Sequence, residues 1–99
     1  TKARKAAEQG LAEADRAWDA GDKAGAASQY RNLLQDRGRK AALKPDEKAR
    51  LFGRLIDFDA ERGEVESAKA LLEEAASGNV TPQVGHPEGL KLLAAHQRQ

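Results

Sequence analysis

The sequence predicts an all-α fold of two stacked antiparallel helix hairpins followed by a C-terminal capping helix. Twenty of the 99 residues are Ala and eleven are Leu, both strong helix formers. Only six residues are β-branched and four are aromatic, which is too few for a sheet. Apolar residues recur at steps of three and four, the period of an amphipathic helix. A plain four- or five-helix bundle is the alternative architecture.

The first hairpin is predicted over residues 3–37. Its first helix carries one apolar stripe, formed by Ala7, Leu11, Ala14 and Trp18. Trp18 is therefore expected in the core, with an exposed anchor for a partner as the alternative reading. Gly21 suits a helix C-terminus and Asp22 suits the N-cap of a second helix. The inner face of that second helix is predicted to consist of Ala26, Ala27, Tyr30, Leu33 and Leu34.

A basic connector of undefined structure is predicted at residues 38–44, and the second hairpin at residues 45–77. Pro45 fits the first position of a helix, and Gly63 separates that helix from the next. Residues 78–85 contain Gly, Asn and Thr-Pro and are predicted to form a loop.

The capping helix is predicted over residues 86–97. His86 precedes Pro87 and is expected to cap it. Leu90 and Leu93 are expected to cover the apolar face of the helix before it, as in the end caps of helical repeats. The chain is thus predicted to form five helices in a single domain.

Composition limits the functional classes. The net charge is only +1, which does not indicate a polyanion-binding tail or a membrane-surface peptide. No apolar run approaches the roughly 20 residues that span a bilayer. There is no Cys, so the compartment is not indicated. The chain opens on Thr1 and lacks Met, so we expect it to be a piece of a larger or processed protein.

The two predicted hairpins form an internal repeat. Gly21 and Gly63 each lie between two helices, and a small residue follows five positions later, Ala26 or Ala68. A larger apolar residue, Tyr30 or Leu72, comes nine positions after each glycine. The small position would allow two helices to approach closely, and the larger one would fill the space between hairpins.

This order of residues resembles the tetratricopeptide repeat family over residues 7–37 and 49–79. The glycines are 42 residues apart, whereas the family period is about 34, so residues 37–46 would hold an insertion. Among the first-helix positions of the family, Phe52 and Leu55 of the second unit fit well. The first unit departs from the pattern, with Gly10 and Ala17 at aromatic positions.

The resemblance implies a concave groove, lined by the first helix of each hairpin, that binds an extended or helical segment of a partner. The candidate partner-binding residues at groove positions are Glu8, Asp15 and Asp19 in the first unit and Arg50, Arg54, Asp57 and Glu61 in the second. Arg50 and Arg54 would grip a partner carboxylate. The alternative is that these charges only solvate a helix face.

No catalytic, metal or cofactor site is predicted. His86 and His96 have no second ligand at metal-site spacing. Asp57, Asp59 and Glu61 are expected to spread over a solvated helix surface rather than to share a pocket that shifts a pKa.

The sequence therefore predicts a non-catalytic protein–protein interaction module, of unidentified partner. Self-assembly as a homodimer is the first alternative, because two hairpins are fewer than the three repeats that a helical array normally needs. A weak nucleic-acid contact through the basic residues of 37–54 is the second alternative, although that segment lacks the interleaved aromatic residues of such sites.

Overall fold

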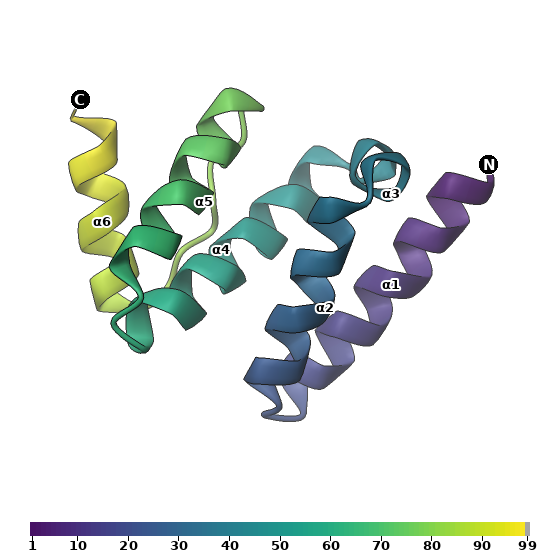
Figure 1. The fold of residues 1–99 in the computed structure, drawn as a ribbon, viewed down its shortest axis with the longest axis horizontal. Helices are drawn as coiled ribbons and strands as arrows, with labels where there is room; N and C mark the ends of the chain where they lie inside the picture. Colours follow the sequence, from purple (N-terminus) through teal and green to yellow (C-terminus); the bar gives the residue numbers. More distant parts are fainter. Residues whose placement is uncertain (99) are drawn as a thin grey trace. The chain divides into compact units, whose positions relative to one another are not determined.

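The computed structural model describes residues 1–98 and confirms the all-α prediction. These residues are 80% helical and contain no strand. The helices are α1 (Lys2–Asp19), α2 (Lys23–Gln35), α3 (Arg37–Ala42), α4 (Pro45–Glu61), α5 (Val65–Ser77) and α6 (Pro87–Gln97) (Figure 1). None of the helices in this described part is long and apolar enough to cross a membrane.

The chain divides into two compact units. Unit 1 comprises Thr1–Lys44 with α1 to α3, and unit 2 comprises Pro45–Gln99 with α4 to α6. In unit 1, α1 packs against α2, and α3 contacts both. In unit 2, α4 packs against α5, and α6 contacts both. Each unit is thus a helix hairpin with a third helical segment resting on it, and the boundary falls where the second hairpin was predicted to begin.

The hairpin turn of unit 1 is built on Gly21, which has a φ of +90°. Its N–H donates to the Trp18 carbonyl at 3.1 Å, and the next N–H, of Asp22, donates to the Ala17 carbonyl at 2.9 Å. This pair of bonds is the Schellman motif that ends α1. The Asp22 carboxylate then accepts from the Gly25 N–H at 3.0 Å and begins α2.

The hairpin turn of unit 2 repeats the Schellman motif, but Glu64 at the N-cap of α5 makes no side-chain cap bond. Gly63 has a φ of +77°, its N–H donates to the Ala60 carbonyl at 3.1 Å, and the Glu64 N–H donates to the Asp59 carbonyl at 2.8 Å. The left-handed conformation at both turns explains why the repeat carries glycine there. The two hairpin turns are therefore equivalent in backbone structure as well as in sequence.

Small residues occupy the helix contacts of both hairpins. Ala26 and Ala68 are fully buried, at 0% exposure each. Tyr30 is also buried, and its ring centroid lies 6.5 Å from that of the half-buried Trp18. The Lys23 ammonium lies 5.1 Å from the Trp18 ring centroid, which places a cation over its open side.

The basic connector forms a helix, so the prediction of five helices was one short. Asp36 is the N-cap of α3 and accepts from the Arg39 backbone N–H at 3.2 Å. Its carboxylate also accepts from the Arg39 Nε at 3.0 Å. These hydrogen bonds lower the pKa of Asp36. At the other end, Leu43 is buried, and Arg4 Nη1 donates to the Ala42 carbonyl at 2.8 Å.

The capping helix begins and ends where predicted, but it covers its neighbour incompletely. Leu90 is 46% exposed, so the prediction that it packs on the preceding helix was wrong. Leu93 is half-buried, and Gly89 is the one buried residue of α6. The spacing of leucines gave the helix but not its orientation, which is set by the segment that precedes it.

Replacing the small helix-contact residues should destabilise each hairpin. Ala26→Leu and Ala68→Leu should each lower the free energy of unfolding by about 1–3 kcal/mol, because the contact has no room for the larger side chain. The matched controls are Ala24→Leu and Ala70→Leu, at exposed positions of the same two helices. Urea denaturation followed by circular dichroism measures the difference, and equal midpoints for core and control variants would contradict the repeat.

Candidate partner-binding surface

The candidate residues of unit 2 lie along one stripe of α4. Pro45 is the first residue of the helix. The negative charges of Asp46 and Glu47 in the first turn interact favourably with the positive end of the helix dipole. The polar stripe of α4 consists of four residues spaced by four, three and four positions, which places them on one side of the helix: Arg50, Arg54, Asp57 and Glu61. Glu61 is exposed and the other three are half-buried.

Asp57 binds an extended segment of the chain itself. We name residues 79–86, which link α5 to α6, the strap. The Asp57 carboxylate accepts from the Gly85 N–H, with Oδ2 at 2.9 Å and Oδ1 at 3.1 Å. Its Oδ1 also accepts from the His86 N–H at 2.9 Å. Two successive backbone donors on one carboxylate make a charge-assisted clamp, so Asp57 fixes the strap to α4.

The strap crosses α4 at Gly53. The Gln83 N–H donates to the Ala49 carbonyl at 3.0 Å, one turn before Gly53. A Cβ on Gly53 would lie 2.1 Å from the Gln83 carbonyl oxygen. Glycine is therefore required here by the close approach of a second backbone. The sequence did carry a signal, because glycine inside a helix costs about 1 kcal/mol and indicates a packing reason.

The strap leads directly into α6. Its last residue, His86, is the N-cap of that helix, and His86 Nδ1 accepts from the Glu88 N–H at 3.2 Å. The predicted capping role of His86 is thus confirmed. A Cβ on Gly89, one turn into α6, would lie 2.6 Å from Val84 Cγ1 and 2.9 Å from Asp57 Oδ1. Gly89 therefore allows the first turn of α6 to sit against the clamp.

Asp59 is not solvated, and the prediction that it lies on the surface was wrong. It is 1% exposed, and its Oδ2 accepts from the Ser67 hydroxyl at 2.6 Å. Ser67 belongs to α5, so this bond joins the two helices of the hairpin. A buried carboxylate satisfied by a neighbouring helix serves the fold.

The acidic candidates of unit 1 differ from one another in their surroundings. Asp15 is half-buried and accepts from the hydroxyl of the buried Tyr30 at 2.5 Å. Glu8 is exposed and forms an ion pair with Arg4 at 2.8 Å. Asp19 is exposed at the end of α1. Since α1 and α4 belong to different units, the shared groove remains a prediction.

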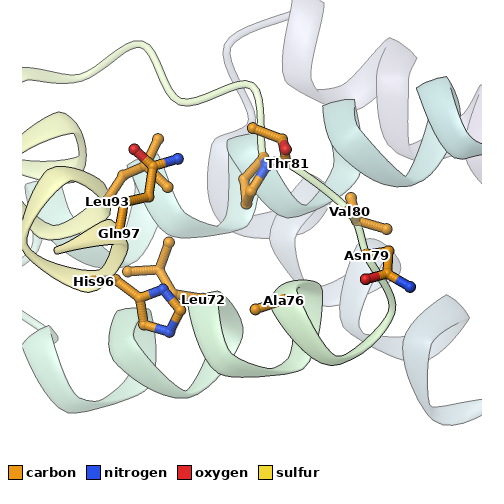
Figure 2. A pocket seen from close by; sticks show the side chains of 9 residues that line it. Leu72, Ala76, Asn79, Val80, Thr81, Leu93, His96 and Gln97 are labelled. Atoms are coloured by element: carbon orange, nitrogen blue, oxygen red, sulfur yellow. The ribbon is translucent and has the colours of Figure 1, made fainter. Parts of the chain in front are cut away.

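A pocket of 320 Å³ opens between α5, the strap and α6. Figure 2 shows Leu72 and Ala76 from α5, Val80 and Thr81 from the strap, and Leu93, His96 and Gln97 from α6 around it. The pocket lies along the second half of α6, beyond the close contact at Gly89. Among residues 1–98, no three His, Cys, Asp or Glu side chains group as metal ligands.

Comparisons with protein-family models, with curated proteins and with solved structures found no match to this chain.

Weakening the clamp should destabilise unit 2. Asp57→Asn keeps the shape of the side chain but removes the charge and one acceptor, so it should lower the free energy of unfolding by about 1–3 kcal/mol. The control Glu61→Gln makes the same chemical change at the exposed end of the same stripe and should stay within about 0.5 kcal/mol of the unaltered chain. Chemical denaturation measures both values, and equal losses would show that the Asp57 bonds contribute nothing to stability.

Proposed function

We propose that this chain is a non-catalytic protein–protein interaction module that binds an extended segment of a partner along α4. The observation that supports the proposal is the strap itself. An extended polypeptide already lies across α4, held by the Ala49 carbonyl and the Asp57 carboxylate. A helix surface that holds one extended backbone has the chemistry to hold another beside it.

The adjoining stripe of α4 supplies the charges for a partner. Successive residues of a helix differ by about 100° around its axis. Ala49 and Gly53 of α4 contact the strap. Arg50 and Arg54 follow them by one position each, so the stripe that contains the two arginines borders the strap. Guanidinium groups favour planar, bidentate binding of carboxylates. The partner segment would therefore place acidic side chains at Arg50 and Arg54, and a basic one toward Glu61.

In unit 1, the acidic residues of α1 form a second candidate row for a partner, at the positions that the tetratricopeptide resemblance implies. Glu8 and Asp19 are the exposed members of that row, and Asp15 is half-buried. A partner would then carry both charge signs, and exposed charges of this kind give binding that weakens as salt rises.

A library of random seven-residue peptides, displayed on phage and selected on the immobilised full chain, tests the proposal. We expect enrichment of peptides with adjacent Asp or Glu residues. The double variant Arg50→Ala/Arg54→Ala should lose the enriched peptides, with affinity falling about tenfold or more for each carboxylate bond removed.

The matched control is Lys91→Ala/Arg98→Ala, which removes the same charge from exposed positions on and beside α6. It should retain the acidic peptides. Equal loss in both double variants would mean that net charge alone governs binding, and selection of no acidic peptide would refute the proposal.

A further inference from the structure

Residues 79–97, the strap with α6, form a segment that we name the arm. Its bonds to α4 join backbone N–H groups of Gln83, Gly85 and His86 to one carbonyl and one carboxylate. Its closest contacts depend on two glycines, Gly53 on α4 and Gly89 in the arm. The arm is thus positioned by a small number of specific polar and steric contacts.

The arm contributes little apolar burial in return. Gly89 is the one buried residue of α6, Leu90 is 46% exposed, and Leu92 and Leu93 are half-buried. In the strap, Pro82 is buried. By contrast α5, which is similar in length to α6, buries four apolar side chains, namely Ala68, Leu71, Leu72 and Ala75. Segments with few buried apolar contacts open at a lower free energy than the rest of a fold.

We propose that the arm detaches as a unit and that the α4 face it leaves binds the arm of a second copy of this chain. The hinge lies at residues 78–79, where α5 ends and Asn79 has a φ of +59°. The occupant is a second copy because the face fits this arm in detail. Gly53 leaves room for the Gln83 backbone. The Asp57 carboxylate contacts the consecutive N–H groups of residues 85 and 86 and lies close to Gly89.

Exchange of identical segments is an inexpensive route to a dimer, because every contact already exists in the single chain. The inference does not depend on Arg50 and Arg54, so its failure and the failure of the proposed function are distinguishable.

A fluorescent synthetic peptide of residues 79–97 tests the exchange, with binding to the full chain followed by anisotropy. The peptide competes with the tethered arm, whose effective concentration is high, so binding to the unaltered chain should be weak. Gly89→Ala in the protein weakens only its own arm and should tighten peptide binding about tenfold. Gly53→Ala blocks the receiving face and should abolish it.

The two glycine variants thus have opposite expected effects, whereas a merely structural role would make both lose binding. Gly38→Ala, in the exposed first turn of α3, is the control and should bind as the unaltered chain does, because the added Cβ would meet only Asp36 Oδ1, at 3.6 Å. If Gly89→Ala binds no more tightly than the unaltered chain, the inference is refuted.

A change in the peptide covers the case in which Gly53→Ala does not fold. N-methylation of the Gly85 amide removes a donor to Asp57 and should weaken binding to Gly89→Ala about tenfold or more. A peptide of the same composition in scrambled order should not bind. Unchanged binding of the methylated peptide would overturn the assigned contacts.

The full chain provides the last readout. After unfolding in urea and refolding at high concentration, light scattering should detect a species of twice the single-chain mass, in a proportion that rises with concentration. Glu88→Gln, an exposed change outside the assigned contacts, should leave this proportion unchanged. A single-chain mass at every concentration would refute exchange between copies.

Discussion

The crossing of the strap over α4 at Gly53 is the constraint on which unit 2 depends. A backbone that passes this close leaves no room for a Cβ, and its amides need acceptors. The Ala49 carbonyl and the Asp57 carboxylate supply them. Once the strap is fixed, His86 starts α6 and Gly89 brings its first turn against the clamp. The 320 Å³ pocket opens along the second half of α6.

Each unit has a glycine inside the first helix of its hairpin, at a close contact with another segment of the same unit. In unit 1 a Cβ on Gly10 would lie 2.9 Å from Leu33 Cδ2 and 3.1 Å from Arg39 Nη1, both ends of flexible side chains. In unit 2 the opposing atoms at Gly53 belong to backbone, which cannot rotate away. The requirement for glycine is therefore stricter in unit 2.

Local signals in the sequence were sufficient for five of the six described helices and for the two hairpin turns. Gly21 and Gly63 marked the hairpin turns, and Pro45 and His86 marked helix starts, because caps and left-handed glycines act within a few residues. Asp36 is a suitable N-cap residue, but the short helix α3 that it begins was not predicted. The roles of Asp57 and Asp59 were not predictable, since their partners are 28 and 8 residues away and depend on how the segments pack.

Backbone recognition and charge recognition have separate roles on α4. The strap is held by amide groups that nearly every residue possesses, so this part of the face selects an extended conformation more than a particular sequence. On the proposed function, selection among partners would then come from side chains beside the strap. Arg50 and Arg54 border it on the polar stripe, where a bidentate guanidinium–carboxylate bond adds geometric as well as electrostatic discrimination.

A segment that satisfied the backbone groups alone would compete poorly with the tethered arm, since the arm satisfies the same groups at a far higher effective concentration. On the two proposals, a foreign partner would therefore bind beside the strap through the arginines, whereas a second copy would gain only by taking the place of the arm.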